Sequence, residues 1–227
     1  MIKSTVIITC GPASALVDEV RRLTNHSTGT LGLQLTRAFA QHGFQVLCCR
    51  SQDCLVPERD FLAVAGEVKI YPFRTNEDLQ LSLMEISRNF SIHGLFHAAA
   101  LCDFSVVGLT DHQGNSMQQT KLSSREGDFF LRLRPAPKLI RSFREWFPRS
   151  RIIGWKYELE GTLKDVIARG QQQIKESQTD GCVLNGRAYG PGFGFLREGY
   201  ELVSCKDGES LADYLASWLK NETYCQV

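Results

Sequence analysis

Strand-like and helix-like segments alternate along the N-terminal half of this 227-residue chain, and this alternation is what most constrains its fold. Short apolar runs are typical of buried strands, and apolar residues that recur every three or four positions are typical of amphipathic helices. Strands connected by helices favour parallel pairing with right-handed crossovers. The sequence therefore predicts a Rossmann-like α/β fold, doubly wound, with a mostly parallel sheet and helices on both faces. The expected strands are 4–10, 45–49, 67–72 and 94–100, and the expected helices are 29–42 and 76–90.

Similar patterns return in the C-terminal half after a long polar segment. The chain is long enough for one α/β domain with a substantial core, so we expect residues 1–227 to form a single domain. The further expected strands are 129–133, 151–155, 181–184 and 200–205, and the further expected helices are 135–147, 162–177 and 210–219.

The polar segment 101–127 has no helical period. A connection of this length inside a compact domain is usually a lid, a binding loop or a dimer arm. The alternative is a disordered insertion. We expect the part from about 104 to 127 to form a flap.

Charge and composition favour a protein that acts on small molecules. Lys and Arg number 26 against 25 Asp and Glu, so no basic excess indicates a nucleic-acid partner. No apolar run approaches the roughly 20 residues that span a membrane, and the first apolar run meets Gly11 too soon for a signal peptide. We expect a cytoplasmic protein with free cysteine thiols. We expect no metal site in the chain, since its eight cysteines include no C-x-x-C pair.

The stretch Val20–Gly32 carries the strongest functional signal. It lies between the first strand and the first helix, where open α/β sheets bind phosphate or carboxylate groups. Ser27, Thr28 and Gly29 precede the helix and are suited to cradle an anion, although simple helix capping is an equally good explanation. Asn25 can donate its amide N–H to a carboxylate or acyl oxygen.

Small residues end the expected strand 94–100. Ala98–Ala100 would let a planar base or ribose approach the backbone, and the alternative is close packing of a helix on the sheet. Asp103 can accept from a nucleotide amino or hydroxyl group, or cap a turn. His97 is expected to be a core histidine. The turn Gly11-Pro12-Ala13 matches neither G-x-G-x-x-G nor a P-loop, so ordinary NAD binding is disfavoured.

Several segments together resemble one family, the phosphopantothenoylcysteine synthetases. The family pattern I-D-x-V-R-x-I-x-N-x-S-S-G-K-M-G is similar to residues 17–32. The remaining matches follow in order and at fitting spacings. They are VIITCGP at 6–12, HAAALCDF at 97–104, RPAPKLI at 134–140, IIGWKYE at 152–158 and DGCVLN at 180–185.

The resemblance implies a two-step amide ligation in coenzyme A biosynthesis. The carboxylate of 4′-phosphopantothenate attacks the α-phosphate of CTP or another nucleoside triphosphate, and the cysteine amine then attacks the acyl-nucleotide. It also implies Mg²⁺ with the triphosphate and a homodimer formed through the flap. No flavin is expected, because the chain starts directly at the first strand and the decarboxylase half of the bifunctional relatives does not precede it.

The resemblance also assigns site residues, position by position. Asn25 would be the catalytic residue. The implied contacts to the acid substrate are Arg21, His26, Ser27, Thr28 and Gly29. The implied contacts to the nucleotide are Gly11, Ala99, Ala100, Asp103, Lys121, Ala136, Pro137, Lys138, Leu139, Trp155 and Asn185.

Several lysines of the family pattern are replaced here. Gln119, Gln173, Ser177 and Thr30 stand where lysines are expected, and Lys121 is the lysine that remains in the flap. A charged contact contributes about 1.5–3 kcal/mol, so either other cations compensate or the ligand differs. A paralogue that is non-catalytic, or that takes another nucleotide or metabolite, is the alternative function. The candidate compensating cations are Arg22, Arg37, Lys138, Lys156 and Arg187.

Overall fold

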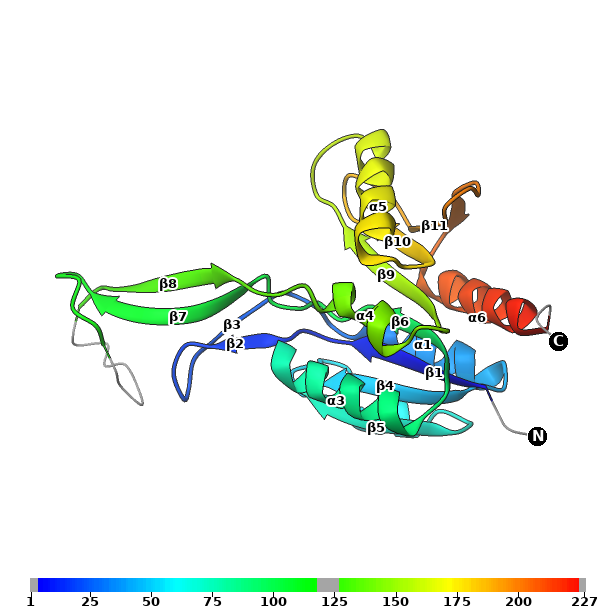
Figure 1. Ribbon diagram of the computed structural model, residues 1–227, viewed down its shortest axis with the longest axis horizontal. Coiled ribbons are helices and arrows are strands. Elements are labelled where there is room, and N and C mark those ends of the chain that lie inside the picture. The colour runs from blue at the N-terminus through cyan, green and yellow to red at the C-terminus, as the bar shows by residue number, and fades with distance from the viewer. Residues whose placement is uncertain (1–3, 118–126, 225–227) are drawn as a thin grey trace.

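A central sheet of eight strands organises the part of the chain that the structure describes, residues 4–117 and 127–224 of a computed structural model (Figure 1). In chain order the strands of this sheet are β1 (Thr5–Cys10), β4 (Gln45–Ser51), β5 (Val68–Phe73), β6 (Ile92–His97), β9 (Arg151–Tyr157), β10 (Gly181–Asn185), β11 (Phe193–Leu196) and β12 (Val203–Cys205). The spatial order is β12-β11-β10-β9-β6-β1-β4-β5. Neighbours from β5 to β10 are parallel, and β11 and β12 are antiparallel at one edge. This confirms the mostly parallel sheet.

Helices cover both faces of the sheet, as predicted. One face carries α1 (Thr30–Gln41), α2 (Glu58–Leu62) and α6 (Gly208–Tyr224), and the other carries α3 (Asn76–Asn89), α4 (Phe143–Trp146) with the 3₁₀ turn η1 (Leu139–Ser142), and α5 (Leu163–Ser177). Alternate residues of β1 pack against the helices on opposite faces of the sheet. Ile8 packs in the cluster of α1 and α6, while Ile7 packs in the cluster of α3 and α4. The strand is buried on both sides, which explains its continuous apolar sequence.

The strand order reverses between β1 and β6. From β1 the chain passes outward through β4 to β5, and it then passes outward on the other side through β6, β9 and β10. At such a point the connections that follow the two strands leave on opposite faces and open a crevice at the carboxyl ends. The fold therefore places a ligand site beside the ends of β1 and β6.

A long two-stranded arm projects from the sheet (Figure 1, left). It consists of β7 (Phe104–Asp111) and β8 (Phe129–Pro135), paired antiparallel. No strand was expected within 101–127, so β7 was missed, while β8 contains the expected strand 129–133. Strand β7 is half-buried along most of its length, and its sequence FSVVGLTD does not alternate apolar with polar residues, so no strand pattern was recognised there. Gln119 and Lys121 lie outside the described residues.

The helix predicted at 135–147 is wrong at its start, and only the part from Leu139 to Trp146 is helical, as a 3₁₀ turn followed by α4. Strand β8 continues through Pro135, and helical structure begins only at Leu139. Ala136 precedes a proline, which disfavours the helical conformation, and its N–H donates to the carbonyl of Asp103 (2.8 Å). The expected strand 94–100 also ends earlier, at His97.

Several short elements were not predicted. They include the hairpin β2 (Ser14–Leu16) with β3 (Arg22–Thr24), the helix α2 and the strand β11. Each is three to five residues long, too short for a periodic pattern to show. Within the described ranges, no helix has the length and apolar character needed to cross a membrane.

The centre of the α1 layer allows a direct test of the core. Phe39 is fully buried, and its ring centroid lies 4.4 Å from that of Phe96 and 5.5 Å from that of Phe44. Phe39→Ala should lower the free energy of unfolding in urea by about 3–5 kcal/mol. Leu81→Ala, at a site 67% exposed on α3, should change it by less than about 0.5 kcal/mol. Equal effects would contradict this assignment of the core.

Candidate functional site

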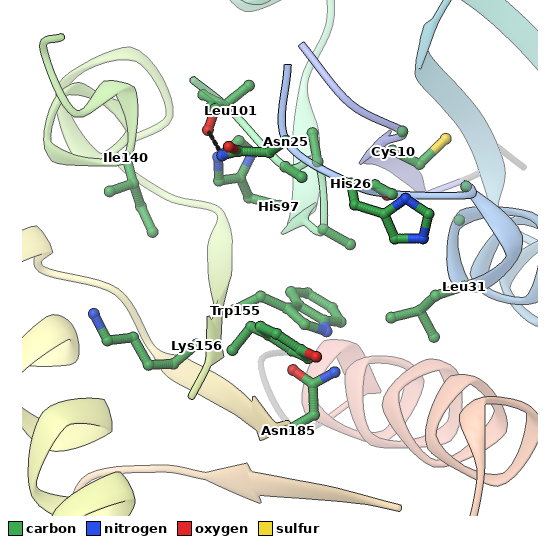
Figure 2. Close-up of a pocket in the computed structure, with 18 of the residues that line it drawn as sticks. Cys10, Asn25, His26, Leu31, His97, Leu101, Ile140, Trp155, Lys156 and Asn185 are labelled. Carbon is green, nitrogen blue, oxygen red and sulfur yellow. Dashed lines mark hydrogen bonds between the residues drawn. The ribbon is translucent and has the colours of Figure 1, made fainter. Parts of the chain in front are cut away.

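A cavity of about 940 Å³ lies at the carboxyl ends of β1, β6, β9 and β10 (Figure 2). It is therefore at the reversal of strand order, and its size is within the roughly 300–1,000 Å³ typical of ligand sites. Its lining comes from segments far apart in the sequence, namely 10–11, 25–32, 97–103, 137–140 and 155–157, with Leu159, Gln173, Asn185 and Phe193.

The floor of the cavity is formed by the two chain segments that follow β1 and β6. Their backbones stay paired beyond the sheet: Ala100 donates its N–H to the Gly11 carbonyl (3.0 Å), and Ala13 donates to the Ala100 carbonyl (2.9 Å). Gly11 has φ of +83°, and a Cβ there would lie 2.8 Å from the Cβ of Ser51. Only glycine fits both conditions.

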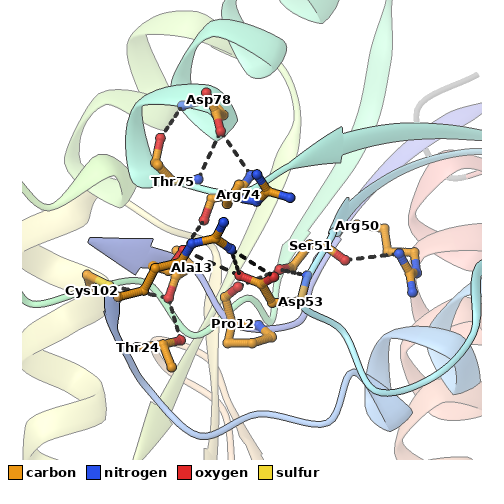
Figure 3. A network of polar contacts seen from close by, with 12 residues as sticks. Pro12, Ala13, Thr24, Arg50, Ser51, Asp53, Arg74, Thr75, Asp78 and Cys102 are labelled. Carbon is orange, nitrogen blue, oxygen red and sulfur yellow. Dashed lines mark hydrogen bonds and ion pairs between the residues drawn. The ribbon is translucent and has the colours of Figure 1, made fainter. Parts of the chain in front are cut away.

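A second set of contacts fixes this floor from behind (Figure 3). The Ser51 hydroxyl donates to the Pro12 carbonyl (2.5 Å), which ties the floor to the end of β4. The Ala13 carbonyl accepts from the Thr24 hydroxyl (2.8 Å) and from the Cys102 thiol (3.3 Å). The three segments that meet at the floor are thus held by buried or half-buried hydrogen bonds.

Asn25 lies at the rim of the cavity, above the end of β6 (Figure 2). Its amide Nδ2 donates to the carbonyl of Leu101 at 2.7 Å. The side chain is exposed, so a ligand can reach it. This contact joins the connection after β1 to the connection after β6. No sequence pattern indicated that the backbone carbonyl of Leu101 accepts this hydrogen bond.

The connection 25–32 enters α1 through Gly29, the residue at the N-cap. Gly29 has φ of +82°, and a Cβ there would lie 2.0 Å from Cys54 Sγ. No side chain caps the helix, although the Thr28 hydroxyl accepts from the Thr30 N–H (3.3 Å). Capping by Ser27 or Thr28 at the N-cap is therefore not what the structure has. The N-terminus of α1 borders the cavity, where its N–H groups favour an anion.

Two buried polar atoms in the wall have no partner among the described residues. They are the indole Nε1 of Trp155, on β9, and the amide Oδ1 of Asn185, at the end of β10. Both residues line the same side of the cavity (Figure 2). Buried donors and acceptors are nearly always paired, so an unpaired donor and an unpaired acceptor here indicate places that a polar ligand fills.

Positive charge in the described lining comes from two lysines. Lys138 forms an ion pair with Asp103, and Lys156 Nζ lies 3.7 Å from a Glu158 oxygen. Gln173 also lines the cavity, with its Nε2 3.5 Å from Cys182 Sγ. The other positions discussed above, namely Arg22, Arg37, Ser177 and Arg187, are outside the lining.

His97 is buried, as expected of a core histidine, and it also reaches the cavity. Its Nδ1 lies 2.8 Å from the Thr9 hydroxyl, and its ring meets that of Phe143 edge-on at 4.9 Å. Burial lowers the pKa of His97 to about 4. The ring is therefore neutral at pH 7.

Most of the site residues predicted from sequence converge on the cavity. Ala136 is buried just outside the lining, Arg21 pairs with Asp18 on the β2–β3 hairpin, and Lys121 is outside the described residues. The predicted residues that line the cavity are Gly11, Asn25, His26, Ser27, Thr28, Gly29, Ala99, Ala100, Asp103, Pro137, Lys138, Leu139, Trp155 and Asn185.

Comparison with known proteins identifies the relatives of this chain. The family model for the DNA/pantothenate metabolism flavoprotein C-terminal domain matches residues 1–214. The coenzyme A biosynthesis bifunctional protein CoaBC of Methanocaldococcus jannaschii is 26% identical over 180 residues, which are 79% of this chain and 40% of that protein. The chain thus corresponds to less than half of the length of this curated relative.

Solved structures share the fold over nearly the whole chain. The DNA/pantothenate metabolism flavoprotein from Streptococcus pneumoniae has a TM-score of 0.81 at 23% identity, with 96% of this chain and 99% of that chain covered. A mutant of Cab2 in complex with phosphopantothenate-cysteine has a TM-score of 0.73 at 18% identity, with 96% and 86% covered.

The burial of His97 predicts a pH-dependent stability. Between pH 6.5 and about 4 the unfolded chain protonates this histidine and the folded protein does not, so the free energy of unfolding falls as the pH falls. The slope from this group is about 1.4 kcal/mol per pH unit. Urea unfolding across this range should show a shallower slope for His97→Gln. The exposed control His112→Gln should keep the wild-type slope, and the same slope in both variants would refute the assignment.

Proposed function

Because the chain belongs to the DNA/pantothenate metabolism flavoprotein C-terminal domain family, we propose that it is a phosphopantothenate–cysteine ligase. The observation that carries this proposal is the cavity that Asn25, the N-terminus of α1, Trp155 and Asn185 line together. The relative CoaBC is a coenzyme A biosynthesis protein, and the related Cab2 structure contains phosphopantothenate-cysteine.

In the first step, the carboxylate of 4′-phosphopantothenate attacks the α-phosphate of a nucleoside triphosphate, and pyrophosphate leaves. The substrate supplies the nucleophile, so the protein needs to position the two reactants and stabilise charge. The N-terminus of α1 and the Thr28 hydroxyl are suited to hold an anionic group. The amide of Asn25 is suited to donate to the acyl oxygen through the second N–H of Nδ2, while the first stays on the Leu101 carbonyl.

In the second step, the amine of cysteine attacks the acyl carbon, and the nucleoside monophosphate leaves as the amide forms. Negative charge develops on the acyl oxygen in this step, and a preorganised amide donor stabilises it. The neutral His97 lies beneath this region, in the cavity floor. Its low proton affinity makes it unsuited to hold a positive charge there.

The nucleotide is proposed to lie across Ala99 and Ala100 toward β9 and β10. The small side chains leave the backbone open, while Trp155 Nε1 and Asn185 Oδ1 offer a donor and an acceptor. CTP is the triphosphate that the resemblance favours. Mg²⁺ is proposed to arrive on the triphosphate, since it usually binds phosphates and keeps several waters. The described residues include no group of three His, Cys, Asp or Glu side chains placed to hold a metal ion.

A second candidate function has its own support. The described lining carries Lys138 and Lys156, each beside a carboxylate, and the neutral Gln173. A triphosphate would meet less net positive charge than the family pattern provides. The alternative is therefore a paralogue that binds a less charged nucleotide or metabolite, without catalysis or with another substrate.

We further propose a homodimer formed through the arm. A two-stranded hairpin is marginally stable alone in water, and a second copy would cover its apolar side chains. The exposed large apolar residues of the arm are Phe104, Phe129, Phe130 and Leu133.

We also propose the cytoplasm as the location of the protein, in keeping with free cysteine thiols.

Pyrophosphate release tests the ligase proposal. We expect release when 4′-phosphopantothenate, cysteine and Mg²⁺ are mixed with CTP, and separately with ATP, GTP or UTP for comparison. Asn25→Ala should lower kcat by roughly 100- to 1,000-fold because it removes the amide donor. The matched control Asn89→Ala changes an exposed amide at the end of α3 that donates to the Glu85 carbonyl (3.0 Å), and it should keep wild-type turnover.

The outcomes separate the two candidate functions. No pyrophosphate with any triphosphate would overturn the ligase. Thermal stabilisation by a nucleotide in the same samples, which reaches about 2.7 kcal/mol at a hundredfold excess over Kd, would then favour the binding paralogue. Full turnover of Asn25→Ala would instead remove the role given to Asn25.

Light scattering coupled to size exclusion tests the dimer. The wild-type protein should elute with twice the mass of one chain, and Phe130→Asp should shift it to the monomer, since Phe130 is 60% exposed on the arm. The control Leu81→Asp, on an equally exposed site of α3, should remain a dimer. A wild-type monomer at micromolar concentration would contradict the proposal.

A further inference from the structure

A buried arginine stands behind the cavity. Arg50, near the end of β4, is 7% exposed, and its guanidinium lies over the ring of Phe61 in α2 (5.6 Å from Cζ to the ring centroid). A buried charge is costly unless it is paired or hydrogen-bonded. The carboxylate with which it pairs, that of Glu58, is 3.9 Å away and half exposed. This ion pair alone does not account for the burial of the guanidinium, and nothing in the proposed ligation uses it.

Hydrogen bonds to backbone carbonyls hold the guanidinium instead. Its Nη1 donates to the carbonyl of Ser51 (3.0 Å), and its Nη2 donates to the carbonyls of Cys54 (3.3 Å) and Val56 (2.6 Å). Figure 3 shows the contact with Ser51. The planar fork of an arginine can reach several acceptors at once in a fixed geometry, which the single ammonium of a lysine cannot do. Arg50 thus gathers residues 51–56 into a loop around its side chain.

The same loop holds the turn that leads into α1. The carbonyl of Thr28 accepts from the backbone N–H groups of Leu55 (3.1 Å) and Val56 (3.2 Å), and the Cys54 thiol donates to it (3.3 Å). Val56 joins the two sets of contacts, because its carbonyl accepts from the guanidinium while its N–H donates to Thr28. A continuous series of hydrogen bonds therefore connects the buried guanidinium to the Thr28 carbonyl.

The loop also packs against both glycines of the site. A Cβ at Gly29 would lie 2.0 Å from Cys54 Sγ, and a Cβ at Gly11 would lie 2.8 Å from the Cβ of Ser51 and 3.2 Å from that of Cys54. Contacts this close leave no free volume, so a shift of the loop must move the turn before α1. The described lining of the cavity includes none of residues 50–56. Their influence on a ligand therefore passes through the turn and the floor.

We propose that Arg50 is a positioning residue: its guanidinium sets the loop 51–56, and the loop fixes the Thr28–Gly29 turn so that the N-terminus of α1 faces the anionic group of the ligand. The ligand part of this inference rests on the proposed function, in which 4′-phosphopantothenate brings an anionic group to this turn. When the turn holds the binding geometry for only a fraction of the time, the apparent Kd rises by the inverse of that fraction.

Arg50→Lys tests the proposal, because it keeps the positive charge and removes the fork. The Kd for 4′-phosphopantothenate by calorimetry should rise about tenfold, as for a turn that is in place about a tenth of the time. In turnover, KM for this acid should rise by the same factor while kcat stays within about twofold, since saturating substrate restores the turn. A mere loss of folded protein would lower kcat and leave KM unchanged. Arg50→Gln is the second variant in case lysine prevents folding.

Arg144 provides a matched control at the other end of the sheet. Its guanidinium also donates to carbonyls, those of Gln178 (3.0 Å) and Ser150 (2.9 Å), and pairs with Asp180. These partners precede β9 and β10, at the amino ends of the strands and away from the cavity. Arg144→Lys should lower the free energy of unfolding and keep the wild-type Kd and KM. An equal rise of Kd in the two variants would overturn the proposal.

Hydrogen exchange followed by NMR gives a readout that needs no ligand. The amides of Leu55 and Val56 should exchange about tenfold faster or more in Arg50→Lys, because local opening of the loop becomes easier. They should exchange at the wild-type rate in Arg144→Lys. Unchanged exchange in Arg50→Lys, or faster exchange with an unchanged Kd, would overturn the positioning role. A wild-type protein that binds neither 4′-phosphopantothenate nor a triphosphate would overturn the proposed function, and the exchange rates would still decide whether Arg50 sets the loop.

Discussion

The backbone pairing between Gly11 and Ala100, beyond the end of the sheet, is the constraint on which the site depends. It holds the segment after β6 beside the segment after β1, so that the two together form the floor of the cavity where the strand order reverses. Gly11 is needed because the pairing requires positive φ and the Ser51 side chain leaves no room for a Cβ. The Asn25 amide then reaches the Leu101 carbonyl one residue further along. A single backbone alignment thus sets the position of the proposed catalytic amide.

The polar groups around this floor suit a reaction in which the substrates carry the chemistry. Asn25, Trp155 and Asn185 offer neutral donors and acceptors, and burial keeps His97 neutral. Lys138 and Lys156 bring charge, but each lies beside a carboxylate. The site is therefore better equipped to hold and orient an acyl group than to attract a triphosphate by charge alone. The small positive charge that the cavity offers to a triphosphate is also what distinguishes the ligase proposal from the binding alternative.

The order of strands and helices was predictable because β1, β4 and α1 have continuous or periodic apolar patterns that report burial. The convergence of Asn25 and Ala99 at one sheet edge followed from that order. Other features left no pattern to find. The half-buried strand β7 has no alternating apolar pattern, Ala136 is held extended by the proline after it, and the unpaired atom of Asn185 depends on which neighbours surround it in space. Such contacts are properties of the folded chain, so they require the structure.

Oxygen transfer provides the most direct test of the central claim, that the substrate carboxylate itself attacks the nucleotide in this cavity. 4′-Phosphopantothenate labelled with ¹⁸O in its carboxylate would be incubated with the protein, cysteine, Mg²⁺ and CTP, and the nucleotide products analysed by mass spectrometry. The account predicts one ¹⁸O atom in the phosphate of the released CMP. Amide product with unlabelled CMP, or with the label in orthophosphate, would contradict it.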